Sequence, residues 1–318
     1  MNFVTRLATR NDINYPLPVN EGLTWTRNGS TWHCQVLIPD LPQDHIITPS
    51  LSLLRESAAY VFAIEAQGVA PVTLQQVPAE TAEHRASGGS EAHISTHIDC
   101  WHTHRRLTHV LVSVRIACER QPADALLIIS CRALTTHTSF NVSTRVVLPQ
   151  PDPISQMEAA QAIRQRICSP TALTMCLSAI IDAPSWDEIT EKCLDPLSRA
   201  YGSWPVAVRA ANDHHLHGAV ELISDWQTVH DILIQGVPIV CSINFGQGEL
   251  TGAPLQQTAG HLVLLYGYDH QHAWVLDPAG SKKDDVPIRY DLKQFGKAWL
   301  HQRGAAYIFC PNAHPLPH

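Results

Sequence analysis

The chain has 318 residues, of which 45% are hydrophobic, and its formal net charge is -7 at pH 7 with the histidines neutral. This length is enough for two domains of ordinary size, and the apolar fraction is enough to give each of them a core. The acidic balance, without any block of lysines or arginines, argues against nucleic acid as the main partner. No apolar run reaches the roughly 18 residues that a membrane helix needs, so we expect no membrane partner.

Two features of the sequence bear on its location. Residues 1–14 lack the apolar segment of a secretory signal. The nine cysteines are scattered through apolar segments instead of following the spacing of a disulfide framework, which is typical of a reducing compartment. The cytoplasm is therefore the expected location.

The first half of the sequence has the pattern of a β domain. Runs rich in β-branched and aromatic residues predict strands at 23–27, 31–38, 60–65, 72–77, 92–101, 108–118, 125–133 and 139–147. Asn28-Gly29 between the first two runs indicates a hairpin turn. Alternation of apolar and polar residues over 110–116 indicates a sheet with one buried face. We predict a β-sandwich or jelly roll in residues 1–148, with a flexible loop at 82–90.

A proline-rich connector follows the β region. Pro149, Pro151 and Pro153 make a stiff, extended segment, so we place the domain boundary there and a second domain at 149–318. Beyond it, the patterns predict helices at 156–166, directly after residue 168, from 185 onward with Ser185 in a capping position, and at 224–235, opened by Ser224. Strands are then predicted at 237–245, 261–268, 273–276 and 305–310. Helices followed by an antiparallel sheet predict an α+β fold.

Cys168 stands at the start of the second of these helices. Ser169 is a good N-cap and Pro170 a favoured first helical residue, so the helix should begin just after the cysteine. Unpaired backbone N–H groups and the positive end of the helix dipole favour a thiolate at that position. Cys168 is therefore a candidate nucleophile, the alternative being an inert packed thiol. Cys176 falls in the apolar stripe of the same helix and should only pack.

His261 opens one predicted strand, and Asp277 closes the next. If the loop between the strands comprises the three residues 269–271, Asp277 lies opposite Val263, on the same face as His261 and diagonal to it. A two-residue loop would put the carboxylate on the other face unless a bulge corrected the register. With Cys168, these two residues have the types of a nucleophile, a base and an orienting carboxylate. Alternatively, His261 is only one of 19 histidines and Asp277 starts an Asp-Pro turn.

Five short segments of the second half carry a family resemblance. They are Ser155-Gln156, Ile167-Cys168-Ser169-Pro170-Thr171-Ala172, Tyr201-Gly202-Ser203-Trp204-Pro205, Gly260-His261-Leu262-Val263 and Leu276-Asp277-Pro278-Ala279. Together they closely resemble the bacterial papain-like cysteine peptidases related to bacteriocin-processing peptidases, over about 150–312. The resemblance implies a papain-like fold for this half of the chain.

The resemblance also implies roles for individual residues. Cys168 would be the nucleophile, His261 the base and Asp277 the orienter. Gln156 would be the side-chain donor of the oxyanion hole, completed by the backbone N–H of Cys168. Gln165 is a rival for that role, because Gln156 lies further from Cys168 than is usual in the family. Trp204, close to the active site by resemblance, and Ser169 are candidate substrate contacts.

Two histidine-rich segments are further candidates. His93, His97, Cys100, His102 and His104 have side chains that suit zinc, but they lack a Cys-x-x-Cys partner, so we expect no metal and no cofactor. The segment His214-His215-Leu216-His217 is predicted to be an exposed loop near the cleft.

Two classes of function remain open. The first is a thiol hydrolase, a cysteine peptidase or amidase that acts on a peptide or protein through a covalent acyl-enzyme. The same residues could pass the acyl group to an amine, as an acyltransferase or transpeptidase does. The second class is a non-catalytic binding protein built on a papain-like scaffold. The sequence predicts neither the substrate, nor the oligomeric state, nor a role for residues 1–148.

Overall fold

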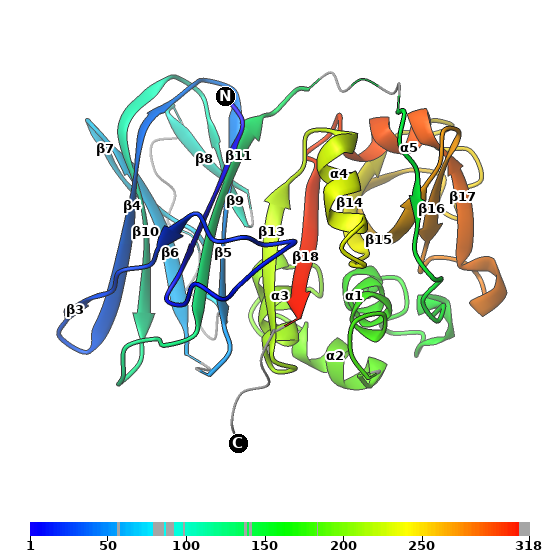
Figure 1. Ribbon diagram of the computed structural model, residues 1–318, viewed down its shortest axis with the longest axis horizontal. Coiled ribbons are helices and arrows are strands. Elements are labelled where there is room, and N and C mark those ends of the chain that lie inside the picture. Colours follow the sequence, from blue (N-terminus) through cyan, green and yellow to red (C-terminus); the bar gives the residue numbers. More distant parts are fainter. Residues whose placement is uncertain are drawn as a thin grey trace.

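The computed structural model describes residues 1–311 except 56–57, 79–85, 87–91, 98, 137–138, 140–141 and 183. Figure 1 shows an N-terminal half made of strands beside a C-terminal half in which helices surround another sheet. The strands of the first two sheets lie between residues 3 and 133, and those of the third between 146 and 311. The chain thus combines helices and mainly antiparallel sheets, as an α+β fold does.

The N-terminal half contains two sheets. The first has the order β2 (Glu21–Gly22), β1 (Phe3–Ala8), β11 (Ala125–Ala133), β5 (His45–Leu53), β9 (Cys100–Thr103), β8 (Ile94–His97). The second has the order β3 (Thr26–Asn28), β4 (Thr31–Leu41), β10 (Leu107–Ala117), β6 (Tyr60–Ala66), β7 (Val69–Thr73). One hydrophobic cluster takes side chains from both sheets, including Phe62, Trp101, Val112 and Ile129. The two sheets therefore share a core.

Several strands of this half were predicted correctly. The β3–β4 hairpin turns at Asn28-Gly29, where Gly29 has a φ of 61° that suits glycine. On β10, the four alternate residues from Val110 to Ile116 are buried, as the alternation predicted. The prediction of one strand at 92–101 is wrong, because β8 and β9 form a hairpin in which His97 pairs with Cys100. The predicted loop at 82–90 lies, apart from residue 86, outside the described residues.

The C-terminal half contains one seven-stranded sheet. Its order is β13 (Leu216–Leu222), β18 (Ala305–Pro311), β14 (Ile239–Phe245), β15 (Thr258–Tyr268), β16 (His272–Leu276), β17 (Pro287–Asp291), and β12 (Val146–Val147) pairs with β15. β12 therefore belongs to this sheet, although it precedes the predicted boundary at 148/149. The predicted strands at 237–245, 261–268, 273–276 and 305–310 correspond to β14, β15, β16 and β18, whereas β13 and β17 were not predicted.

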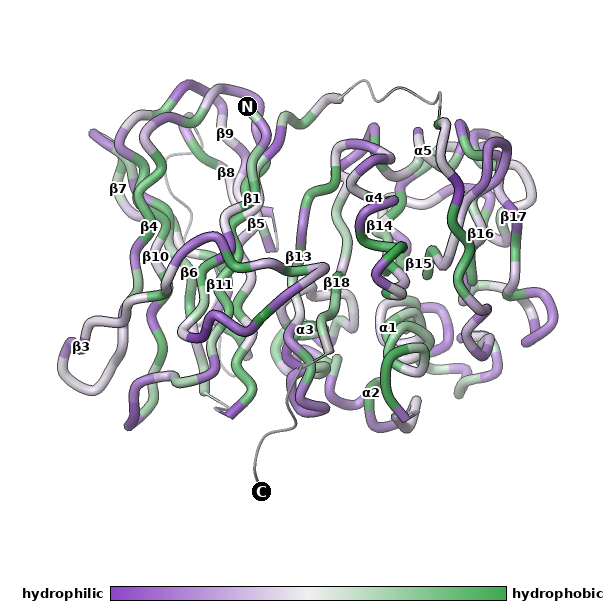
Figure 2. Tube along the Cα trace, in the orientation of Figure 1, coloured by the Kyte–Doolittle hydropathy of each residue, from purple (hydrophilic) through white to green (hydrophobic). Residues whose placement is uncertain are grey.

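Helices cover both faces of this third sheet. α1 (Cys168–Ser178), α2 (Trp186–Lys192) and α3 (Trp204–Asn212) pack on one face, and α4 (Trp226–Leu233) and α5 (Leu292–Trp299) on the other. Figure 2 shows hydrophobic residues concentrated along α1. The structure contains, in the part of the chain that it describes, no helix long and apolar enough to cross a membrane.

The helix predictions were correct in part. α2 is capped by Ser185 as predicted, and α4 lies within the predicted range but is capped by Asp225. The helix predicted at 156–166 is wrong, because only a 3-10 turn, η2 (Gln156–Glu158), and further turns form there. α3 and α5 were not predicted. The second 3-10 turn, η3 (Lys283–Asp285), precedes β17.

The two halves meet along β13, the edge strand of the third sheet. Three alternate N–H groups of β13 donate to serine hydroxyls of β5 and β11: Gly218 to Ser52 (3.3 Å), Val220 to Ser50 (3.0 Å) and Leu222 to Ser130 (2.9 Å). Arg6 of β1 also forms a bidentate ion pair with the buried Glu221, at 2.6 and 2.7 Å. The first sheet therefore covers an edge that would otherwise present unpaired backbone groups.

Candidate active site

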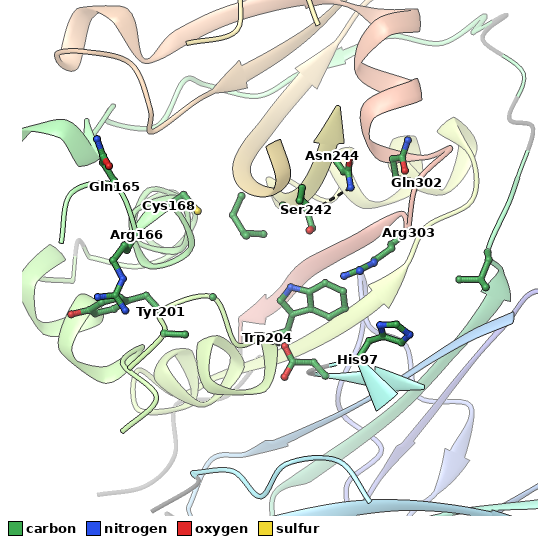
Figure 3. A pocket seen from close by; sticks show the side chains of 17 residues that line it. His97, Gln165, Arg166, Cys168, Tyr201, Trp204, Ser242, Asn244, Gln302 and Arg303 are labelled. Atoms are coloured by element: carbon green, nitrogen blue, oxygen red, sulfur yellow. Dashed lines mark hydrogen bonds between the residues drawn. The ribbon is translucent and has the colours of Figure 1, made fainter. Parts of the chain in front are cut away.

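Cys168 is the first residue of α1 and lines a cleft. Its side chain is partly exposed, and in Figure 3 the sulfur points toward the open centre of the cavity. Cys176 lies on the same helix but is completely buried, and burial raises the pKa of its thiol. α1 therefore carries one accessible thiol and one packed thiol, as the apolar stripe of the helix predicted.

The helix begins two residues earlier than the predicted cap at Ser169 and the predicted first helical residue at Pro170 indicate. Its N-cap is Ile167, which makes no side-chain cap, and Cys168 is already helical. The prediction that Ser169 caps the helix is wrong. Ser169 is fully buried, its hydroxyl lies 3.0 Å from the Tyr307 hydroxyl, and it does not line the cleft, so the structure does not bring it to a substrate.

His261 and Asp277 form a buried pair on adjacent strands. The Nε2 atom of His261 lies 2.7 Å from Oδ1 of Asp277, and both residues are at most 3% exposed. The imidazole and the Cys168 thiol influence each other's ionisation: His261 lowers the pKa of the thiol, and the thiol raises the pKa of the imidazole. Because Nε2 is taken by the carboxylate, Nδ1 is the ring nitrogen left for an interaction with the sulfur. The order from sulfur to imidazole to carboxylate is that of a nucleophile, a base and an orienter.

A bulge in β15 places the carboxylate on the correct face. The loop between the strands comprises residues 269–271 as predicted, but Tyr268 pairs with Ala273 instead of His272. That pairing alone would turn Asp277 away from His261. Between Leu265 and Gly267 the register shifts by one residue, and Leu264 then pairs with Leu276. The register at the His261 end is thus the predicted one, although the route to it differs.

Two further groups hold the Asp277 carboxylate. The hydroxyl of Tyr290, on β17, donates to Oδ2 at 2.7 Å, and the backbone N–H of Ala279 donates to Oδ1 at 2.9 Å. The sequence analysis missed Tyr290, because β17 was not predicted. The available signal was a tyrosine in a short β-like run, since a buried tyrosine usually needs a partner for its hydroxyl. Asp277 is therefore fixed from three sides.

The charges of these groups are mutually dependent. Burial alone would lower the pKa of His261, but the charge and hydrogen bond of Asp277 outweigh burial and raise it. Burial alone would raise the pKa of the Cys168 thiol, but the His261 imidazole and the backbone N–H of Leu262 bring it below its ordinary value. The pKa of Asp277 is likewise lowered in spite of burial, through His261, Tyr290 and Ala279. The arrangement favours a thiolate beside an imidazolium.

The cleft has a volume of about 730 Å³ and lies between the two halves of the chain. Cys168 and Trp204 line it from the α1 and α3 side, and Ser242 and Asn244 line it from β14. Trp204 is the first residue of α3, and its indole forms part of the wall, as Figure 3 shows. Trp204, a predicted substrate contact, therefore lines the same cleft as Cys168.

The two glutamines considered for the oxyanion hole occupy different environments. Gln156 is 4% exposed, and its side-chain amide donates to the backbone oxygen of Arg164 at 2.6 Å. Its backbone N–H donates to Pro278, directly after Asp277, at 2.8 Å. Gln165 lines the outer cleft, but Figure 3 shows its side chain pointing away from Cys168. Gln156 is thus the glutamine tied to the segment that carries the carboxylate.

Several side chains of the two histidine-rich segments pack against neighbouring protein groups. In the β8–β9 hairpin the rings of His97 and His102 stack with centroids 3.9 Å apart, and the Cys100 thiol points to the backbone oxygen of His97 at 3.4 Å. In the described ranges, no three histidine, cysteine or acidic side chains are grouped to hold a metal ion. The prediction of an exposed loop at 214–217 is wrong at its end, because β13 begins at Leu216 and His217 is buried.

Comparison with known proteins places this half of the chain in a family. The model of the Peptidase_C39-like family matches residues 150–307. A crystal structure described as that of a C39-like peptidase from Bacillus anthracis aligns with a TM-score of 0.41 and 17% identity, covering 52% of this chain and 98% of that one. No curated protein matches the chain. The region 150–307, which contains Cys168, His261 and Asp277, belongs to the Peptidase_C39-like family of papain-like cysteine peptidases.

Proposed function

We propose that the protein is a cysteine peptidase or amidase that acts on a peptide or protein through Cys168, His261 and Asp277. The observation that carries the proposal is the buried His261–Asp277 pair at 2.7 Å, beside the one sulfur that lines the large cleft. Membership of a peptidase family supports a peptide bond as the target. In this proposal the N-terminal half is a β-sandwich domain and residues 149–318 are the peptidase domain.

The first half of the reaction forms an acyl-enzyme. The Cys168 thiolate attacks the carbonyl carbon, a carbon–sulfur bond forms, and the carbonyl electron pair moves to oxygen. The resulting oxyanion accepts hydrogen bonds from the backbone N–H of Cys168 and from the amide of Gln156, which has two N–H donors and spends one on Arg164. The carbon–nitrogen bond then breaks, and the His261 imidazolium gives its proton to the leaving amine.

The second half of the reaction releases the acyl group. His261, now neutral, takes a proton from a water molecule, whose oxygen attacks the thioester carbon. The carbon–sulfur bond breaks, and the Cys168 thiolate and the His261 imidazolium are restored. Asp277 stays ionised throughout and holds the ring so that Nδ1 faces the sulfur.

A peptide mixture and an electrophilic probe test the proposal together. The wild-type protein should cleave members of a diverse octapeptide mixture, and a peptidyl acyloxymethyl ketone should label Cys168, identified by mass spectrometry of the digest. The Cys168→Ala variant should do neither while keeping the wild-type circular dichroism spectrum. Labelling spread over other cysteines, without cleavage, would favour a binding protein on a papain-like scaffold.

A further inference from the structure

Both halves of the chain build the cleft. His97 and Asp99 belong to the β8–β9 hairpin, and Leu134 directly follows β11. Arg303 comes from the turn between α5 and β18 and lines the same cavity as Cys168. The N-terminal half therefore forms one wall of the space in which a peptide would bind.

The hairpin of the N-terminal half is fixed to the start of α3. Asp99 is buried and accepts hydrogen bonds on both carboxylate oxygens, from the backbone N–H of Trp204 at 2.8 Å and from the Ser203 hydroxyl at 3.2 Å. Burial raises the pKa of Asp99 to about 7, so near neutral pH the residue carries only part of a negative charge. The one acidic residue in the cleft lining is thus engaged by α3 and largely hidden.

Arg303 differs from the other arginine of the cleft. Arg166 is engaged, since it donates to the backbone oxygen of Arg199 and lies over the Tyr201 ring at 5.7 Å. Arg303 is exposed, and it forms no ion pair with any carboxylate in the described ranges. Figure 3 shows its guanidinium extending into the cavity toward the Trp204 indole. A protein of net charge -7 therefore presents inside its cleft a cation that forms no salt bridge among the described residues, although its charge lowers the pKa of Asp99.

The backbone at Arg303 is held in place by its neighbour. Gly304 has a φ of +62°, and a Cβ atom there would collide with the guanidinium of Arg132 and the backbone oxygen of Ile223. The N–H of Gly304 donates to Trp299 at 3.0 Å, and its oxygen accepts from Ile223 at 2.8 Å. Arg303 is thus mounted on a rigid turn, which reduces the entropy lost when its side chain binds a ligand.

We propose that Arg303 is a specificity-determining residue that binds a carboxylate of an acidic peptide substrate. The proposal rests on the proposed peptidase function and names the class of substrate. A guanidinium presents a planar pair of donors that matches a carboxylate, and Trp204 lines the same cavity as Arg303. The carboxylate can be that of a glutamate or aspartate side chain or that of the peptide's C-terminus.

Paired peptides measure the preference directly. The substrates are N-acetylated, C-amidated octapeptides whose members differ only by Glu or Gln at one position, with a parallel set that has a free C-terminus. Competition within one mixture gives the ratio of kcat/KM for each pair. A charge-assisted hydrogen bond predicts a preference of about tenfold or more for Glu at one position. A free-acid advantage without a Glu preference would identify the C-terminal carboxylate as the group bound.

Two variants assign the preference to Arg303. Arg303→Gln should remove it, bringing the ratio close to 1, while the Gln peptide is cleaved within about threefold of the wild-type rate. The control is Arg115→Gln, which removes the same charge from the exposed side of β10 in the second sheet, away from the cleft lining, and should keep the wild-type ratio. An unchanged preference in Arg303→Gln, or a wild type that prefers neither Glu nor a free C-terminus, overturns the proposal.

A binding measurement separates this proposal from the proposed function. Fluorescein-labelled Glu and Gln peptides are titrated with the Cys168→Ala variant, with and without Arg303→Gln, and followed by anisotropy. Tighter binding of the Glu peptide, lost on Arg303→Gln, supports carboxylate recognition even if the wild type cleaves nothing. Equal binding of the Glu and Gln peptides, without tighter binding of peptides that have a free C-terminus, refutes it even if the wild type is an active peptidase.

Discussion

The Nε2 atom of His261 lies 2.7 Å from Oδ1 of Asp277, in a position from which solvent is almost excluded. A carboxylate in such surroundings favours the charged imidazole, because it supplies the opposite charge that water cannot supply there. The other ring nitrogen is then available to Cys168, and the charged imidazole lowers the pKa of the Cys168 thiol. In the proposed mechanism, the ionisation of Cys168 therefore depends on Asp277 through the charge that this carboxylate stabilises on His261.

Removal of the proposed base, His261, should lower kcat/KM nearly as much as removal of the proposed nucleophile, Cys168. We expect His261→Ala to reduce kcat/KM by a factor on the order of 10⁴ or more, because the members of such a unit act together. The double variant Cys168→Ala/His261→Ala should be no less active than either single variant. The measurement is cleavage of the octapeptide mixture. If the losses of the two single variants multiplied in the double variant, the two residues would be acting independently.

Asp277→Asn should leave more activity than these variants. The amide keeps the size of the side chain but removes the charge that raises the pKa of His261. We expect kcat/KM to fall by about 10², and the alkaline limb of the pH profile to move to lower pH, because the imidazolium loses its proton sooner. A variant with full activity and an unchanged profile would remove Asp277 from the triad.

Tyr290→Phe tests the support of the carboxylate. Loss of the hydroxyl leaves Oδ2 of Asp277 without its 2.7 Å donor, which should cost about 1 to 3 kcal/mol of unfolding free energy in a urea titration. Because that hydrogen bond lowers the pKa of Asp277, the acid limb of the activity profile should move to higher pH.

The matched control is Tyr60→Phe. Tyr60 is also buried, but its hydroxyl has no hydrogen-bond partner among the residues that the structure describes. That variant should unfold at the wild-type urea concentration or above it, with an unchanged pH profile. If both tyrosine variants behaved alike, the Tyr290 hydroxyl would have no particular effect on the site.

The pH dependence of the wild type follows from the two shifted groups. The lowered pKa of Cys168 means that kcat/KM rises with pH at values below that of an ordinary thiol. The raised pKa of His261 means that activity falls only when the pH passes well above the usual value for histidine. Initial rates should therefore form a plateau that includes neutral pH. A single rise centred near pH 8.5, as for an unperturbed thiol, would be inconsistent with an ion pair.

Arg132→Met tests the junction between the two halves. The guanidinium of Arg132 is fully buried, donates to the backbone oxygens of Ile223 and Leu300, and has a pKa lowered by burial to about 10. Removal of these donors leaves two buried carbonyls unpaired, at a cost of about 2 to 4 kcal/mol in unfolding free energy. Arg115→Met, an exposed control, should change it by less than about 0.5 kcal/mol. Equal urea midpoints for both variants would show that the junction does not depend on Arg132.

The sequence predicted those parts of the fold whose signals are local. Alternation over 110–116, the Asn28-Gly29 turn and the Ser185 cap each depend on residues close together in the chain, and each appears in the structure. β5 was missed because its polar Thr48, Ser50 and Ser52 face β13, so the strand is buried throughout and shows no simple polar face. Such a pattern can be understood only with the partner strand present.

The candidate active site likewise combines features that the sequence predicted with features that depend on distant parts of the chain. The residue types and the strand order brought His261 and Asp277 into register, but the bulge at Tyr266 and the hydroxyl of Tyr290 depend on pairings that no short pattern specifies. Ser169 was misassigned because a serine before proline resembles a cap, whereas its hydroxyl serves a distant tyrosine on β18. No sequence pattern pointed to Arg303 as a candidate site residue, because its position in the cleft depends on segments that are far apart in the chain.

The central claim is that His261 and Asp277 make the Cys168 sulfur a thiolate. The direct measurement is the rate of iodoacetamide alkylation at pH 6, followed by mass spectrometry for Cys168 and for Cys118, the other partly exposed cysteine in the described ranges. An unperturbed thiol is less than about 1% thiolate at this pH. Cys168 should react at least about tenfold faster than Cys118 in the wild type, and this advantage should disappear in His261→Ala. Equal rates at the two cysteines, or an advantage that survives His261→Ala, would contradict the account.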